Sequence, residues 1–210
     1  AVDENALDHD FRKYTDAFAA AEQHRKDGDS ELNLACRDGI AAALPRVLLQ
    51  SSPEKLGRAL VIAAQHGHRE CVSELMSKAA EMEMTVATHA PEAVWAVAKG
   101  NGRRAPGANF RYAAPEKQWN KSWFEFEDQE RCRIAEVLLA GGGDIEHTGS
   151  SGGSPLYWAC WRGFSTLVQL LIAKKANVNF KRKDNALTPL HVAADADIVC
   201  QLFSAKADLH

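Results

Sequence analysis

His66 and His68 are separated by a single residue and resemble a pair of metal ligands. A structural zinc site needs about four ligands, which proteins often supply from Cys-x-x-Cys or spaced histidine pairs. The chain contains no Cys-x-x-Cys and no His-x-x-x-His. We therefore predict no bound metal.

Catalytic chemistry has equally little support in the sequence. Cysteine and histidine are both present, as a thiol hydrolase requires, but no H-E-x-x-H or phosphate-loop motif occurs. Gly141-Gly142-Gly143 and Ser150-Ser151-Gly152-Gly153 could cradle a phosphate, yet each falls where the internal repeat described next requires a turn. The sequence therefore predicts neither an enzyme nor a cofactor.

Two segments near the end of the chain repeat each other. Ser154-Pro155-Leu156-Tyr157-Trp158-Ala159 recurs 34 residues later as Thr188-Pro189-Leu190-His191-Val192-Ala193. In both copies a hydroxyl residue precedes a proline, which is the typical start of a helix because the hydroxyl caps it and proline fits its first turn. A period near 33 residues indicates a stack of two-helix units.

The second copy matches the pattern T-P-L-H-x-A, and the segments after the helices support the same assignment. Leu170 to Asn179 and Val137 to Glu146 both read like the ending L-L-L-x-x-G-A-D-V-N. The chain therefore resembles the ankyrin-repeat family. The resemblance implies an all-α solenoid of about five helix pairs with short β-hairpin fingers. It also implies that His68 and His191 form structural hydrogen bonds between units.

A small residue four positions before a glycine identifies the weaker units. The pairs are Ala35 with Gly39, Ala63 with Gly67, Ala96 with Gly100, and Ala159 with Gly163. Pro45 should delay or bend the second helix of the first unit. The predicted helices cover 30–39 and 42–49, 59–67 and 70–76, 92–100 and 130–140, 155–163 and 166–173, and 189–194 and 198–205.

This organisation divides the chain into an N-terminal segment, 1–29, and a repeat domain, 30–210, with an insertion at about 101–129. Leu7, Phe11, Tyr14 and Phe18 lie on one helical face, which predicts a cap helix over the first unit; a coiled-coil partner helix is the alternative. Ala207-Asp208-Leu209-His210 resembles the start of another finger. We therefore expect further repeats or another chain to cover the C-terminal end.

The insertion has no explanation in the repeat pattern. It is rich in aromatic and basic residues, and its candidate binding residues are Arg111, Tyr112, Trp119 and Trp123. One interpretation is a loop that packs its aromatics on the solenoid. The other is a recognition loop, since aromatic and arginine residues dominate binding hot spots. Stacking on nucleic acid bases would use the same composition, but the overall charge disfavours it.

A second candidate surface follows from the family resemblance, because ankyrin proteins usually bind through finger tips and residues just before the helix-ending glycine. Trp161 occupies a position that normally faces solvent, so we expect an exposed aromatic anchor. Together with nearby basic residues, it should favour an acidic or carboxylate-bearing protein partner. The candidate residues on this surface are Arg37, Gln65, His66, Lys99, Trp161, Arg162, Lys181, Arg182 and Lys183.

Composition limits the remaining possibilities. The net charge of −3 does not imply a polyanionic partner, and no apolar run is long enough to predict a membrane helix or a membrane partner. Cys36, Cys71, Cys160 and Cys200 fall at predicted core positions, which indicates reduced thiols and an intracellular, cytoplasmic or nuclear, location.

The sequence thus predicts a protein–protein interaction module, a scaffold or adaptor. The alternative is a regulatory or targeting domain of a larger enzyme or channel, and nucleic-acid binding through the insertion ranks third. Neither the partner nor the biological process follows from the fold.

Overall fold

The computed structural model describes residues 31–49, 51–100, 121–193 and 195–207. Within these ranges the chain is helical and contains no strand. The elements are α2 (Glu31–Asp38), the 3-10 helix η2 (Ala41–Ala43), α3 (Leu44–Leu48), α4 (Pro53–His66), α5 (Arg69–Glu81), α6 (Val86–His89), α7 (Ala93–Lys99), α8 (Lys121–Ala140), α9 (Pro155–Arg162), α10 (Ser165–Ala173), α11 (Pro189–Val192) and α12 (Ala196–Ser204).

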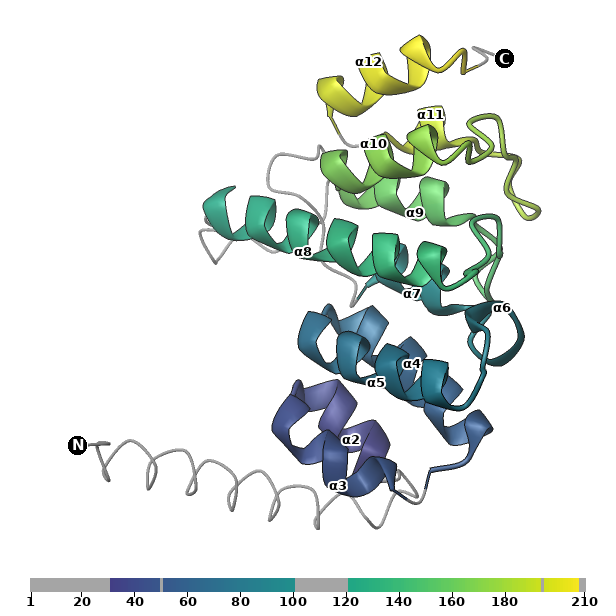
Figure 1. The fold of residues 1–210 in the computed structure, drawn as a ribbon. Helices are drawn as coiled ribbons and strands as arrows, with labels where there is room; N and C mark the ends of the chain where they lie inside the picture. The colour runs from purple at the N-terminus through teal and green to yellow at the C-terminus, as the bar shows by residue number, and fades with distance from the viewer. Residues whose placement is uncertain (1–30, 50, 101–120, 194, 208–210) are drawn as a thin grey trace.

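The helices pack in pairs that follow one another along an elongated molecule (Figure 1). One row consists of α2, α4, α7, α9 and α11, each in contact with the next. The second row runs through α3, α5, α8, α10 and α12 and covers the first. The connecting loops after α8 and α10 lie together along one side of the stack (Figure 1). This arrangement bears out the expected all-α architecture.

The hydroxyl–proline pairs start helices as predicted. The Ser154 hydroxyl accepts a hydrogen bond from the backbone N–H of Tyr157 at 3.2 Å, and Pro155 is the first residue of α9. Ser52 caps α4 in the same way through the N–H of Lys55, at 3.4 Å. The prediction that this helix begins at residue 59 was wrong by six residues, because Ser52-Pro53 is a third copy of the start signal.

Helix ends also follow the sequence signals. Gly67 and Gly163 end α4 and α9 in the left-handed region, at φ of 78° and 88°, where a residue with a Cβ would be strained. The second helix of the first unit starts late, as Pro45 predicted. A 3-10 turn precedes it, and α3 begins at Leu44 with the proline in its first turn.

Small residues and cysteines form the contacts between units. Ala35, Ala63, Ala96 and Ala159 are all buried, as the repeat alignment predicts. Cys36, Cys71, Cys132 and Cys160 are buried, but Cys200 is exposed, so its predicted core position was wrong. All five thiols are free. Burial raises the pKa of Cys36 to about 12 and that of Cys71 to about 11.

The predicted β-hairpin fingers at 144–154 and 177–188 are not formed by paired strands in this structure. They are turns held by side-chain and backbone hydrogen bonds. The Asp144 carboxylate accepts from the N–H of Glu146 at 2.9 Å, and the Asn177 amide oxygen accepts from the N–H of Asn179 at 3.0 Å. At the tip of the second finger, Arg182 N–H donates to Leu187 C=O at 3.0 Å and Ala186 N–H donates to Arg182 C=O at 2.8 Å.

Three further features differ from expectation or lie outside the description. Helix α8 starts at Lys121, nine residues before the predicted residue 130, and so takes up the end of the predicted insertion. A short extra helix, α6, precedes α7. The predicted cap helix within 1–29 and insertion residues 101–120 lie outside the described residues. None of the described helices is both long and apolar enough to span a bilayer.

Candidate partner-binding surface

Aromatic and basic side chains from two adjacent units meet at the contact between α7 and α9. We call this group the tryptophan cluster; its members are Trp95, Lys99, Tyr157, Trp158, Trp161 and Arg182. The rings of Trp158 and Trp161 meet edge to face, with centroids 5.6 Å apart and planes at 76°. Tyr157 meets Trp158 in the same manner at 5.5 Å. Such edge-to-face pairs hold the rings in defined positions.

Two cations flank this aromatic core. The Lys99 ammonium lies 4.5 Å from the Trp95 ring centroid and 5.7 Å from that of Trp158. The Arg182 guanidinium lies 5.6 Å from the ring centroids of both Tyr157 and Trp158. At these distances the negative faces of the rings attract the cations. Lys99 and Arg182 are therefore held against the stack rather than extended into solvent.

Polar contacts fix the same two cations. The Lys99 ammonium donates to the Ser151 hydroxyl at 2.7 Å, which ties α7 to the loop before α9. Arg182 forms an ion pair with Asp184 at 2.8 Å, within its own loop. Side chains from α7, from α9 and from the loop after α10 thus converge on Trp158.

Glycines let the loop before α9 pack directly on the cluster. A Cβ added at Gly149 would lie 2.6 Å from the Trp95 ring, and one at Gly153 would lie 2.8 Å from Nε1 of Trp158. An expectation from the sequence that no G-x-S-x-G pattern occurs was wrong, because Gly149 to Gly153 match this nucleophile pattern. That motif requires a turn from a strand into a helix, and no strand occurs among the described residues. Close packing therefore accounts for these glycines.

The prediction that Arg162 is an accessible donor was wrong. Its side chain is 1% exposed, and it donates from Nε to the backbone carbonyl of Lys99 at 2.6 Å, with a second bond from its terminal nitrogen to the same oxygen. Trp161 is only partly exposed, because it packs against Trp158, so the fully exposed anchor expected from the sequence is not present. Arg162 joins two units, and Trp161 is partly exposed beside it.

The remaining predicted residues have varied positions. Lys181 and Lys183 are exposed on the loop that carries Arg182. Arg37, Gln65 and His66 are partly exposed and lie nearer the N-terminal end of the stack, on α2 and α4 (Figure 1). Outside the described residues are Arg111, Tyr112 and Trp119, together with the side chain of Trp123 at the start of α8.

Side chains tie successive units together through the carbonyls at helix ends. His68 Nε2 donates to the carbonyl of Arg37 at 2.9 Å, which confirms its predicted bridging role. His191, by contrast, bonds to Thr188 of its own unit at 2.7 Å, so the prediction that it bridges units was wrong. His66 stacks on His68, and burial, followed by this neighbour, lowers the pKa of His66.

Arg131 is the largest such tie, and sequence reasoning missed it. Its side chain is 2% exposed and donates to the carbonyls of Val97, at 2.8 Å, and Gln65, at 3.3 Å. It also pairs with Glu127 at 2.9 Å and lies 5.3 Å from the ring centroid of Phe164. One side chain therefore joins three successive helix pairs. Burial lowers the pKa of Arg131, and Glu127 opposes this effect.

The end of the predicted insertion is part of the stack. Asp128 is 5% exposed and accepts from the backbone N–H groups of Thr166, at 2.7 Å, and Leu167, at 3.0 Å, which caps α10 from a different helix. Burial raises the pKa of Asp128, and these two hydrogen bonds oppose the rise. Phe124 stacks on Phe164 with centroids 5.2 Å apart. For this part of the insertion, packing on the solenoid is the correct interpretation.

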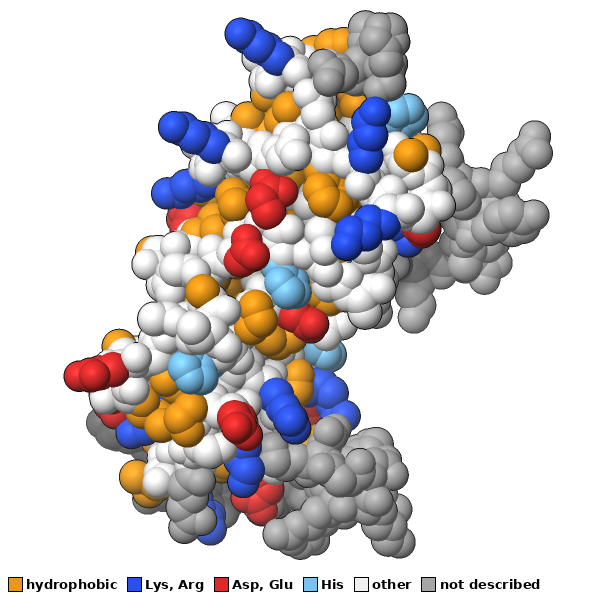
Figure 2. Space-filling model, turned by 90° about the vertical axis from the view of Figure 1, so that its right-hand side faces the viewer, with side chains coloured by type: hydrophobic (Ala, Val, Ile, Leu, Met, Phe, Trp, Pro, Cys, Tyr) orange, Lys and Arg blue, Asp and Glu red, His pale blue; other side chains and the backbone are white. Residues whose placement is uncertain are grey.

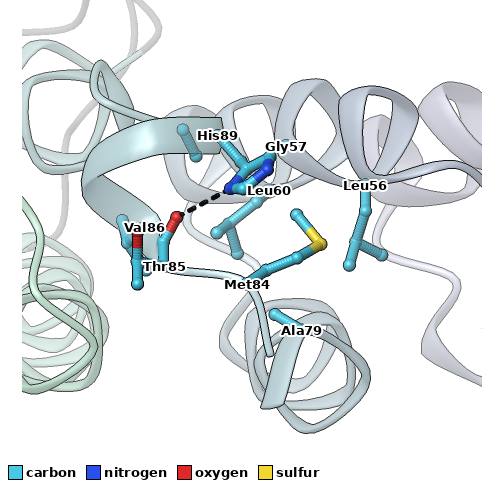
Figure 3. Close-up of a pocket in the computed structure, with 9 residues that line it drawn as sticks. Leu56, Gly57, Leu60, Ala79, Met84, Thr85, Val86 and His89 are labelled. Atoms are coloured by element: carbon cyan, nitrogen blue, oxygen red, sulfur yellow. Dashed lines mark hydrogen bonds between the residues drawn. The ribbon is translucent and has the colours of Figure 1, made fainter. Parts of the chain in front are cut away.

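An apolar hollow lies between α4, α5 and α6 (Figure 3). It encloses about 210 Å³, part of it open to solvent, whereas small-molecule sites usually have about 300–1,000 Å³. The His89 ring at its edge is hydrogen bonded to the backbone carbonyl of Thr85 at 3.2 Å (Figure 3). The lining residues are Leu56, Gly57, Leu60, Ala79, Met84, Thr85, Val86, His89 and Ala90. The hollow is too small for a cofactor.

Charges of both signs are interspersed on the face of the molecule where the loops lie (Figure 2). Hydrophobic side chains reach the surface between them (Figure 2). In the part of the chain described, no three histidine, cysteine or acidic side chains gather as a metal ion would require.

The second half of this stack matches a known protein family. Residues 127–210 match the model for ankyrin repeats, in three copies. These residues are ankyrin repeats. The ankyrin segment begins within α8 and includes α9 and the loop with Arg182, so it carries most of the tryptophan cluster. A comparison with curated proteins finds no match to the chain.

Proposed function

We propose that this protein is a protein–protein interaction module that binds its partner through the tryptophan cluster and the adjacent exposed lysines Lys181 and Lys183. The observation that carries the proposal is the convergence of two aromatic rings, Tyr157 and Trp161, and two cations, Lys99 and Arg182, on Trp158, which is partly exposed. Tryptophan, tyrosine and arginine are the residues that dominate protein interfaces. Ankyrin repeats generally serve as interaction modules, which agrees with this role.

We further infer five ankyrin-type repeats in the domain 30–210. The supporting observation is that each of the pairs α2–α3, α4–α5, α7–α8, α9–α10 and α11–α12 contacts the next. A cap helix within 1–29 and a recognition role for insertion residues up to 120 stay predictions. A packed stack presents a preformed surface, which reduces the ordering cost of binding.

The charges near the cluster favour an acidic partner. Lys181 and Lys183 are exposed, and Asp184 is the acidic residue in the same loop. The four buried free thiols support an intracellular location, where thiols stay reduced. No feature of the cluster suggests a catalytic role, so we propose that the chain is not an enzyme.

Two alternatives remain from the sequence analysis. The chain can be the regulatory or targeting domain of a larger enzyme or channel, and this role would use the same surface. Nucleic-acid binding would depend instead on the basic and aromatic insertion, and its affinity would fall steeply with salt. Deleting residues 103–118 would weaken nucleic-acid binding but leave a partner of the tryptophan cluster bound.

Replacement of Trp161 with alanine tests the proposed function. The protein is used to capture partners from a cell lysate, and the captured partner is then purified and titrated. We expect the Trp161→Ala variant to bind it about 2 kcal/mol more weakly, which is roughly a 30-fold loss. The matched control is Phe203→Ala on α12, whose ring is 47% exposed and should not affect binding.

Folding must be measured in parallel, because Trp161 packs on Trp158. Loss of this aromatic contact should cost about 1 kcal/mol of stability and leave the protein folded by circular dichroism. Equal partner affinity for the wild type and the Trp161→Ala variant would show that the surface is elsewhere.

A further inference from the structure

We propose that the tryptophan cluster is a carboxylate-recognition site that takes an extended acidic segment of a partner protein, with one acidic side chain at Lys99 and a second at Arg182. This inference rests on the proposed function and adds the chemistry of the ligand. It is supported by an uncompensated charge, by a set of polar groups that can only donate, and by the positions in which the two cations are held.

The charge near the cluster is not balanced. Lys99 forms no ion pair with any carboxylate in the described part of the chain; its contact is with the neutral Ser151 hydroxyl. Lys181 and Lys183 are exposed and likewise form no ion pair there, while Asp184 pairs with Arg182. Two of the three N–H donors of the Lys99 ammonium therefore remain for a ligand. A carboxylate is the group that such an ammonium binds best.

The polar atoms without partners at the cluster are all donors. Nε1 of Trp95, Nε1 of Trp158 and Nε of Arg182 are buried and have no hydrogen-bond acceptor among the described residues. Trp95 is only 6% exposed, and a buried indole N–H normally finds an acceptor. Because these atoms are covered, a docked ligand would not bond to them directly. They show that the unpartnered polar atoms around Trp158 are donors, which favours an acceptor-bearing ligand at the two cations.

The ring of Trp158 sets the spacing of the two cations. Lys99 Nζ and Arg182 Cζ lie 5.7 and 5.6 Å from its centroid, so they are within about 11 Å of each other, the sum of these distances. An extended peptide advances about 3.3 Å per residue. Two carboxylates that reach both cations should therefore come from acidic residues about two to four positions apart.

Asp184 occupies one of the two positions in the absence of a partner. Its carboxylate forms an ion pair with Arg182 at 2.8 Å. Arg182 is the same residue that the second acidic side chain of the partner would contact. The intramolecular pair therefore competes with the partner. Its removal should strengthen binding, which a purely apolar docking surface would not predict.

A random peptide library displayed on phage tests the inference, because it does not prescribe the ligand. Peptides selected on the wild-type protein are synthesised with a fluorescent label, and their dissociation constants are measured by anisotropy. We expect two aspartate or glutamate residues at the predicted spacing. Changing either one to its amide should weaken binding at least 5-fold, and binding should weaken as salt rises.

Variants of the protein complete the test. Lys99→Met should weaken the selected peptides at least 10-fold, and Lys99→Arg should retain most of the affinity. Asp184→Asn should strengthen them about 3-fold. The matched control is Lys55→Met, which removes the same charge from an exposed position on α4 and should change affinity less than 2-fold. Circular dichroism establishes that each variant is folded; if Lys99→Met is not, the Asp184→Asn result decides.

The possible failures are distinguishable. If the selected peptides lack acidic residues but lose affinity in Trp161→Ala, the interaction module stands and carboxylate recognition is wrong. If no selected peptide depends on Trp161 or Lys99, both proposals are wrong. If Asp184→Asn leaves the affinity unchanged while Lys99→Met lowers it, the second position at Arg182 is wrong. A stronger, Lys99-dependent affinity for a single-stranded oligonucleotide would overturn the choice of a protein partner.

Discussion

Replacement of Arg131 with alanine should destabilise this protein more than any surface substitution on α8. The side chain is 2% exposed and joins three helix pairs through the carbonyls of Val97 and Gln65 and the ring of Phe164. A buried carbonyl that loses its donor costs about 1–1.5 kcal/mol, and lost packing over the ring adds about 1 kcal/mol. We therefore expect the free energy of unfolding to fall by about 3 kcal/mol.

Glu127 limits the size of this effect. Breaking a fully buried ion pair typically costs 3–5 kcal/mol, because the remaining charge has no partner. The Glu127 side chain is 21% exposed, so water can solvate its carboxylate after Arg131 is removed. The lower end of that range is therefore appropriate. Arg131→Met, which keeps the aliphatic stem but no donor, should recover the packing contribution and separate it from the hydrogen bonds.

Urea denaturation provides the assay. Trp95, Trp158 and Trp161 lie on α7 and α9, so their fluorescence reports on that part of the stack, whereas circular dichroism reports on every helix. Because stacked units are stabilised by their neighbours, loss of the tie to α4 should let the N-terminal pairs unfold first. In the Arg131→Ala variant we expect the circular dichroism signal to fall at lower urea than the fluorescence signal.

Arg133 offers a matched control on the same helix. Its side chain is 55% exposed and pairs with Glu130 at 2.7 Å, so Arg133→Ala should change stability by no more than about 0.5 kcal/mol. Equal destabilisation by Arg131→Ala and Arg133→Ala would refute the reasoning, because the buried hydrogen bonds would then contribute nothing beyond a surface ion pair.

Three further predictions follow from single contacts. Asp128→Ala should cost about 1–3 kcal/mol and speed hydrogen exchange at the two amides that it caps. Burial raises the pKa of Asp128, so the contribution of its protonation to the free energy of unfolding is complete below the unfolded pKa and is lost as pH rises through the folded pKa. The wild type should therefore gain stability relative to Asp128→Asn when the pH is lowered from 7 to 4. The midpoints of urea unfolding measure this difference. In the native protein the exposed Cys200 should react quickly with a thiol reagent, whereas the four buried thiols, Cys36 among them, should react slowly. Absorbance should therefore show one equivalent of fast-reacting thiol. Fast reaction of all five thiols would contradict the burial. Phe124→Ala should lower the free energy of unfolding by about 2 kcal/mol, as measured by thermal or urea unfolding, because it removes the stack on Phe164. Phe126 is 61% exposed, so Phe126→Ala should cost less than about 0.5 kcal/mol. Similar costs for the two variants would mean that the Phe124–Phe164 stack is unimportant.

Local signals in the sequence sufficed for the repeat and for several helix boundaries. Hydroxyl–proline pairs start α9 and α11, and a glycine ends α9, because caps and left-handed helix ends depend on a few neighbouring residues. The buried alanines could be predicted because the repeat period brings equivalent positions to the same contact. His68 was assigned its bridging role from the family pattern alone.

Tertiary structure alone decided which polar side chains are buried and which are available to a partner. Arg162 and Lys99 both carry a positive charge near the end of an inner helix, yet Arg162 turns inward to the Lys99 carbonyl while the Lys99 ammonium lies over two rings. The carbonyl that Arg162 contacts is 63 residues away in the sequence, and one of the two rings that Lys99 contacts lies on another helix. No local sequence pattern therefore distinguishes the two cations. Arg131 and Asp128 were missed for the same reason. A charge on a helix favours solvent unless a distant carbonyl or amide meets it, and only the packed stack brings those groups together.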